Sequence, residues 1–170
     1  MRYSFFLFVL FFFSCKTLSV HEILDKKFDK IERASYFLYF YPNSQIYIKR
    51  DKLTNNFSVF LNIVLNLDLK SDFNSDYLKL IQDGNYIGNV SISKVVSIGR
   101  FRFLYVNIDR GNSDLILRAL NPHKSLSFVL DEYSYQVWTR ETLEYDAKFI
   151  DVDFESSRNT LKYALENNIL

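Results

Sequence analysis

The chain has 170 residues, an aromatic content of 18% and only 4 glycines and 2 prolines, a composition that argues against long disordered or low-complexity stretches. Lysine and arginine total 21 against 20 acidic residues, so the balanced charge gives no electrostatic case for a nucleic-acid partner. We therefore expect a folded protein that does not bind nucleic acid.

The beginning of the chain has the layout of an export signal. Arg2 places a positive charge before an apolar run from Phe5 to Phe13, which ends at Ser14 and Cys15. This run is about half of the roughly 17 to 25 residues that a transmembrane helix needs. We therefore expect residues 1–14 to be a cleaved signal peptide rather than a permanent membrane span.

The residues Phe12-Phe13-Ser14-Cys15 resemble the lipobox of bacterial lipoproteins, in the looser form that spirochaete lipoproteins accept. The resemblance implies cleavage just before Cys15 and attachment of thioether-linked diacylglycerol and an acylated amine to that residue. Cys15 is also the only cysteine, so it has no partner for an intramolecular disulfide. The alternative is an incidental cysteine in an uncleaved hydrophobic N-terminus.

Residues 15–20 would then form a short lipidated tether. The four residues 17–20 span at most about 15 Å when extended, which favours the periplasmic face of the envelope over the cell surface. About 155 residues remain after the signal, enough for one domain with a substantial core. We expect residues 21–170 to form a single β-rich globular domain.

The start of this domain predicts a helix over 19–34. Ser19 and Glu22 have the spacing of a capping box. Apolar residues then recur at helical spacing, namely Val20, Ile23, Leu24, Phe28 and Ile31. The opposite face mixes bases and acids that nearly cancel, which favours a solvated face over a patch that binds lipid headgroups.

Most of the remaining chain shows the alternation and turn signals of β-strands. We expect strands at 36–41, 45–49, 57–69, 77–81, 86–90, 92–96, 101–108, 126–130, 135–139 and 145–154. The run 57–69 is the clearest, because every odd position is apolar and most even positions are polar, so one face is expected to be buried. Phe60 and Val64 interrupt the polar face at its centre, which suggests that something covers it there.

Two further helices complete the predicted elements. Asn112 or Ser113 is expected to cap a short helix over 112–120, and Ser156 or Ser157 a closing helix that ends at Asn167-Asn168. The expected fold class is therefore α+β, mainly antiparallel sheet or sandwich, with an N-terminal and a C-terminal helix packed on it.

The sequence shows little sign of catalytic chemistry. It lacks the short motifs of metal hydrolases, redox proteins, serine hydrolases and nucleotide-binding proteins, and its two histidines, His21 and His123, lie in unrelated settings. Alternation along a strand would aim Asp151, Asp153 and Glu155 to one side, where they form weak candidates for a Ca²⁺ site. A solvated outer face is the simpler explanation, and we expect no enzyme and no cofactor.

Aromatic residues offer a candidate binding surface. Exposed tyrosine and tryptophan side chains favour recognition, although sheet cores also use many aromatic residues. The candidates lie in two predicted hairpins and are Tyr36, Tyr39, Tyr41, Tyr47, Tyr133, Tyr135 and Trp138.

These features predict a non-enzymatic lipoprotein, held at the membrane by its lipid anchor, that binds another envelope protein or supports an envelope assembly. The rival hypothesis is a periplasmic carrier of a small ligand or lipid, in which the amphipathic strand 57–69 would line a cavity.

Overall fold

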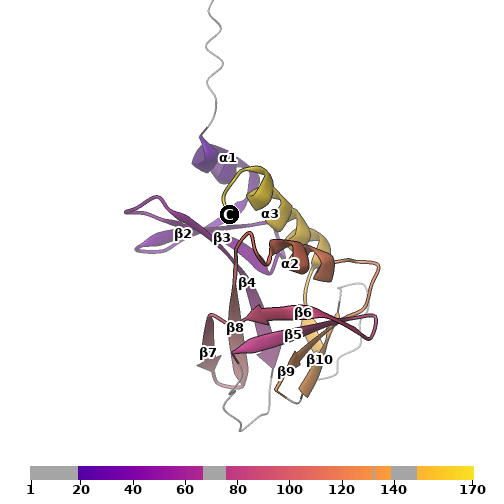
Figure 1. The fold of residues 1–170 in the computed structure, drawn as a ribbon. Helices are drawn as coiled ribbons and strands as arrows, with labels where there is room; N and C mark the ends of the chain where they lie inside the picture. Colours follow the sequence, from indigo (N-terminus) through magenta and orange to yellow (C-terminus); the bar gives the residue numbers. More distant parts are fainter. Residues whose placement is uncertain (1–18, 67–75, 132, 139–148) are drawn as a thin grey trace, which may run out of the picture.

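The computed structural model describes residues 19–66, 76–131, 133–138 and 149–170, which form two β-sheets and three helices (Figure 1). Sheet A has six strands in the order β1 (Asp29–Glu32), β2 (Tyr36–Phe40), β3 (Ile46–Asp51), β4 (Phe57–Asn66), β8 (Phe101–Ile108) and β7 (Lys94–Ile98). Sheet B has five strands in the order β11 (Phe149–Asp151), β10 (Tyr133–Trp138), β9 (Leu126–Leu130), β5 (Tyr77–Gln82) and β6 (Asn85–Ser91). The helices are α1 (Val20–Lys27), α2 (Ser113–Ala119) and α3 (Phe154–Glu166). The expected α+β class is confirmed, and among the described strand pairs only β10 with β11 is parallel.

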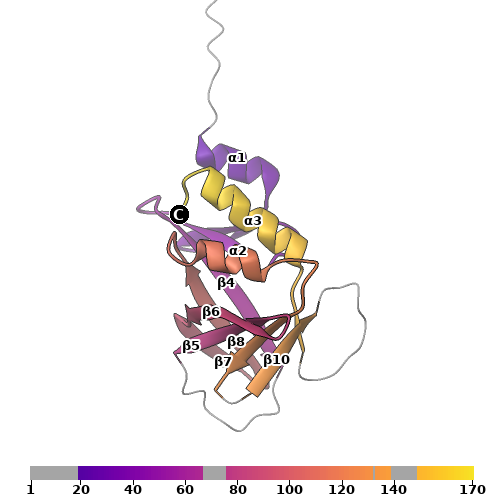
Figure 2. The same cartoon turned by 45° about the vertical axis from the view of Figure 1, so that its right-hand side comes forward.

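Both sheets and all three helices contribute to one hydrophobic core. Strand β11 lies against β4, β6 lies against β8, and α3 lies against β3. In both views the helices gather at one end of the molecule, with strands β5 and β6 beside α2 (Figures 1 and 2). Sheet B and α3 therefore pack on the same face of sheet A, which we call its inner face.

Strand β4 shows how the sequence produces two different faces. The odd-numbered Val59, Leu61, Ile63 and Leu65 are buried in the core, with at most 3% of each exposed. The even-numbered side chains point to the opposite, outer face, where Phe60 is half-buried. The predicted alternation is confirmed over the described strand, while residues 67–69 lie outside the described part of the chain.

Tight turns join the local hairpins as the sequence predicts, with one shift. Asp83 and Gly84 both have positive φ values, 50° and 76°, which a two-residue hairpin turn requires. The expected strand 92–96 is wrong in its bounds, because β7 runs through Ile98 and the turn consists of Gly99 and Arg100. Gly99 has a φ of 57°, so the glycine fixes where the turn forms.

The predicted first helix is too long. Ser19 and Glu22 do interact as a helix start, because the Ser19 backbone N–H donates to Glu22 Oε2 at 2.8 Å. The helix ends at Lys27, Phe28 is extended, and β1 follows, with Ile31 opposite Leu38 of β2. Pairing with a strand later in the chain therefore overrides the helical spacing of the apolar residues.

The C-terminal boundary also differs from the prediction. Of the expected strand 145–154, the described residues contain only β11, because helix α3 begins at Phe154. The predicted helix caps at Ser156 and Ser157 are therefore wrong. Asp153 is the N-cap, and its side chain accepts a hydrogen bond from the Ser156 backbone N–H at 2.9 Å. The predicted end of α3 at Asn167 and the predicted helix α2 are confirmed.

A small polar seam holds α3 on sheet A. Ser44, Ser157 and Thr160 are all buried, with at most 2% of each exposed. Ser157 Oγ accepts the Gln45 backbone N–H at 2.9 Å, and the Thr160 hydroxyl lies 3.1 Å from Ser44 Oγ. The seam therefore joins the C-terminal helix to the turn between β2 and β3, which lies more than a hundred residues earlier in the chain.

Replacement of Ser157 by alanine should destabilise the fold by about 1–3 kcal/mol, because the partly buried Gln45 N–H loses its acceptor. Urea unfolding followed by circular dichroism measures the change. Asn159→Ala, at an exposed position of the same helix, is the control and should change stability by less than about 0.5 kcal/mol. Equal effects of the two substitutions would contradict the role of the seam.

Candidate functional site

The outer face of sheet A carries a row of aromatic side chains from four neighbouring strands. Phe40 of β2 lies 5.2 Å from Tyr47 of β3, measured between ring centroids. Tyr47 stacks on Phe60 of β4 at 5.5 Å, and Phe60 lies 5.7 Å from Tyr105 of β8. The sheet register produces this row, since Tyr47 and Phe60 are paired directly across β3 and β4. Each contact is worth about 0.5–1.5 kcal/mol beyond the area it buries.

Three residues of this row, Tyr47, Phe60 and Tyr105, line a hollow of about 500 Å³, which we call the outer groove. Its lining side chains come from all six strands of sheet A and from the residue before β7, so the outer face is concave. They are Ile31, Tyr36, Leu38, Tyr47, Lys49, Ser58, Phe60, Asn62, Ser93, Lys94, Tyr105 and Asn107. Half of these residues are aromatic or aliphatic and half are polar or charged, so the groove offers both apolar contact and hydrogen-bonding groups.

The charge of the outer groove is entirely positive. Lys49 and Lys94 line it, whereas no aspartate or glutamate belongs to the lining. Lys49 Nζ lies 5.0 Å from the centroid of the Tyr36 ring, a cation–π arrangement that holds the ammonium group at the groove. The groove therefore favours a negatively charged occupant.

Asn62 adds a polar group without a partner. The side-chain amide oxygen of Asn62 is buried, and the described part of the chain supplies no hydrogen-bond donor to it. An unsatisfied buried acceptor costs about 1–3 kcal/mol and calls for an explanation. Other atoms of Asn62 line the groove opposite Tyr105, whereas this oxygen is closed off from it.

The structure divides the tyrosine residues of the first predicted hairpin between two environments. Tyr36 and Tyr47 line the outer groove. Tyr39 points the other way and is fully buried in the core. Tyr41 packs against the core, 4.4 Å from the ring of Phe28, so neither Tyr39 nor Tyr41 belongs to the candidate surface.

The second predicted group of aromatic residues does not form part of the groove in the described structure. Tyr135 is buried, with 4% of its surface exposed, on the inner side of sheet B. The side chains of Tyr133 and Trp138 lie outside the part of the structure that is described. The groove instead uses Tyr105 and Lys94, which the sequence did not single out. The pairing of β4 with β8 brings Tyr105 to the groove, and the pairing of β8 with β7 brings Lys94 there.

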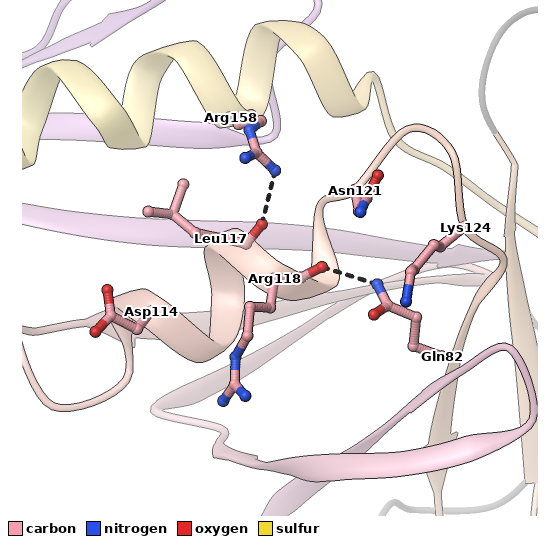
Figure 3. Close-up of a pocket in the computed structure, with 7 residues that line it drawn as sticks. All are labelled: Gln82, Asp114, Leu117, Arg118, Asn121, Lys124 and Arg158. Atoms are coloured by element: carbon pink, nitrogen blue, oxygen red, sulfur yellow. Dashed lines mark hydrogen bonds between the residues drawn. The ribbon is translucent and has the colours of Figure 1, made fainter.

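A second cavity, of about 620 Å³, lies at the C-terminal end of α2 (Figure 3). Arg158 Nη1 donates to the Leu117 carbonyl oxygen at 3.0 Å, and Gln82 Nε2 donates to the Arg118 carbonyl oxygen at 2.8 Å. Both donors therefore satisfy carbonyl groups at the end of the helix, which have no partner within it. They hold α2 to α3 and β5, so the outer groove is the stronger candidate. The side chains that line this second cavity are Gln82, Asp114, Leu117, Arg118, Asn121, Lys124 and Arg158.

The acidic residues near the C-terminus do not share one side of a strand. Strand β11 ends at Asp151, Asp153 caps α3, and Glu155 lies exposed in the first helical turn, so the predicted alternation is wrong. The side chain of Asp151 lies outside the described residues. Within the described ranges, no three His, Cys, Asp or Glu side chains are grouped to hold a metal ion. His21 and His123 are both exposed.

Comparison of the chain with protein families, curated proteins and solved structures finds no match. In the described segments, none of the helices combines the length and apolar character of a membrane span. The candidate site therefore stands on its geometry, in which aromatic contacts and positive charge meet on one concave sheet face.

Burial raises the pKa of Tyr47, and the nearby phenol of Tyr105 adds to this effect. Because the pKa of Tyr47 is higher in the folded than in the unfolded state, its contribution to the free energy of unfolding is fully present below about pH 10. This contribution is lost as the pH rises through the folded-state pKa. Tyr47→Phe should therefore make the alkaline loss of stability less steep, although the buried Tyr39 and Tyr163, whose pKa values are also raised, retain their share. Urea unfolding at a series of pH values measures this slope.

The matched control is Tyr86→Phe, which removes a phenol that is 60% exposed on sheet B. This substitution should leave the alkaline slope as in the parent protein. A slope that Tyr47→Phe leaves unchanged would show that the phenol is not desolvated in the groove.

Proposed function

We propose that this protein is a lipoprotein of the bacterial cell envelope, anchored through Cys15, whose β-rich domain binds another protein through the outer groove. The observation that carries the binding role is the concave outer face of sheet A, where Tyr47, Phe60 and Tyr105 share the lining with Lys49 and Lys94. The anchor rests on the lipobox-like residues, which precede the described part of the chain.

The features of the groove fit a segment of a partner protein. Tyrosine and phenylalanine supply much of the contact energy at protein interfaces, because they bury large areas with little loss of side-chain freedom. The positive charge of Lys49 and Lys94 favours a partner segment with acidic side chains. We therefore propose a partner segment that combines aromatic or apolar side chains with acidic ones.

A carrier of a small ligand or lipid is the second candidate. This hypothesis expects a cavity along the apolar side of the strand at 57–69. In the structure that side, formed by Val59, Leu61, Ile63 and Leu65, is packed in the core. The hollow beside β4 lies along its other side, at Ser58, Phe60 and Asn62. A volume of about 500 Å³ lies in the range of small-ligand sites, so native mass spectrometry for retained ligand distinguishes the two candidates.

The proposed role is non-enzymatic and is exercised at the periplasmic face. The short predicted tether would keep the domain close to its membrane.

Substitution of Lys49 by glutamate should weaken capture of the envelope partner at least about tenfold, because it puts a negative charge beside the proposed acidic segment. Affinity capture from envelope extracts with the purified protein, quantified against protein concentration, measures the effect. Lys79→Glu is the control, since it makes the same change of charge at an exposed position of β5 in sheet B. Equal loss in both variants would contradict binding at the groove.

The lipid anchor predicts that cells grown with radiolabelled palmitate incorporate label into the protein. Cys15→Ala should abolish the label and release the product from the membrane fraction, because two or more acyl chains are what make anchoring stable. Ser14→Ala keeps a small residue before the cysteine and should retain both properties. Unlabelled parent protein, or a Cys15→Ala variant that behaves as the parent does, would refute the anchor.

A further inference from the structure

The hairpin of β7 and β8 exposes apolar side chains at its end. Six large hydrophobic residues are exposed in the described part of the chain, and three of them belong to this hairpin. Ile98 is 61% exposed, Val95 39% and Phe101 37%. Such a concentration of exposed apolar surface marks a site of interaction.

The end of the hairpin is held in a fixed shape. Ile98 and Phe101 are paired across the turn formed by Gly99 and Arg100. Arg102 Nη1 donates to the Gly99 carbonyl oxygen at 2.9 Å and lies 3.3 Å from that of Phe101. The exposed Ile98 and Phe101 are therefore presented together by a closed turn. We call Val95, Ile98, Arg100, Phe101 and Arg102 the hairpin tip.

The charged residues of the hairpin tip itself are both positive. The hairpin tip contains Arg100 and Arg102, and the guanidinium of Arg100 lies 5.4 Å from the centroid of the Phe101 ring. No acidic residue occurs in the sequence between Asp83 and Asp109. Apolar side chains with cations beside them match the outer layer of a lipid bilayer, where acyl chains lie under negatively charged headgroups.

The hairpin tip lies at the far end of the molecule from α1. In both views α1 lies at the top and β7 near the bottom (Figures 1 and 2). The proposed lipid anchor precedes α1 by only a few residues. A surface contacted by the hairpin tip would therefore be a different one from the membrane that holds the anchor.

We propose that the hairpin tip binds a second lipid surface that carries anionic headgroups, so that the protein bridges two membrane surfaces. A bilayer interface is favoured over a protein partner because it requires only apolar insertion and positive charge, without matched directional hydrogen bonds. The lipid contact itself needs only the hairpin, whereas bridging rests on the proposed anchor at Cys15.

Reconstitution of the full lipidated protein tests this proposal. The protein is inserted into vesicles of phosphatidylcholine, which are mixed with fluorescent vesicles of phosphatidylcholine alone or with added phosphatidylglycerol. Fluorescent vesicles should be recruited only when they contain phosphatidylglycerol. Arg100→Gln with Arg102→Gln should reduce recruitment on the order of thirtyfold, at about fivefold for each cation, and Ile98→Ser should reduce it roughly tenfold.

Matched controls keep the charge and polarity changes but move them away from the hairpin tip. Lys79→Gln with Lys162→Gln removes two exposed cations elsewhere, and Leu53→Ser removes an apolar side chain that is 90% exposed in another turn. These variants should recruit vesicles as the parent does, and thermal melting checks that every variant is folded.

The outcomes separate the two claims. Protein that fails to float with the first vesicles would refute the anchor. The hairpin tip can then be tested separately, by attaching the protein to the first vesicles through a polyhistidine tag and nickel-chelating lipid and measuring recruitment of the anionic vesicles. Anchored, folded protein that recruits neither vesicle type, or equal losses in the tip and control variants, would overturn the proposal. So would a change of oligomeric state on Ile98→Ser without any vesicle recruitment, since the tip would then join copies of the chain.

Discussion

The alternation of side chains along the strands of sheet A is the constraint on which the rest of the structure depends. In β4 the odd positions fill the core and the even positions line the outer groove. A slip of one residue in the pairing of β4 would place Phe60 in the core and Leu61 at the surface. Core packing and the candidate binding face are therefore fixed by the same register.

In the described structure, the other elements pack on only one face of sheet A. Sheet B and α3 pack on its inner face, and the seam between Ser157 and Gln45 fixes α3 there. The outer face keeps its aromatic row, whose rings contact one another across the strands rather than a further layer of the described structure. Phe60, which interrupts the polar side of β4, is thus covered by its neighbours Tyr47 and Tyr105.

Local signals in the sequence predicted much of the fold, and pairings distant in sequence account for most of what they missed. The alternation of β4, the Asp-Gly turn and the short helix α2 each depend on a few adjacent residues, and all three elements were predicted correctly. The first helix was predicted too long because Ile31 lies in β1 and pairs with β2. The closing helix begins before the predicted caps because Asp153 is its N-cap. The tyrosine-rich hairpin pointed to half of the site, whereas Tyr105 and Lys94 reach it only through the pairing of β4 with β8 and of β8 with β7.

Site-specific photocrosslinking in living cells tests most directly whether the outer face of sheet A is the binding face. A photoreactive phenylalanine analogue in place of Phe60 would line the outer groove, and the same analogue in place of Tyr86 would lie exposed on sheet B. Our account predicts a discrete crosslinked protein product from position 60 that is absent from position 86. No product at position 60, or the same product from both positions, would contradict it.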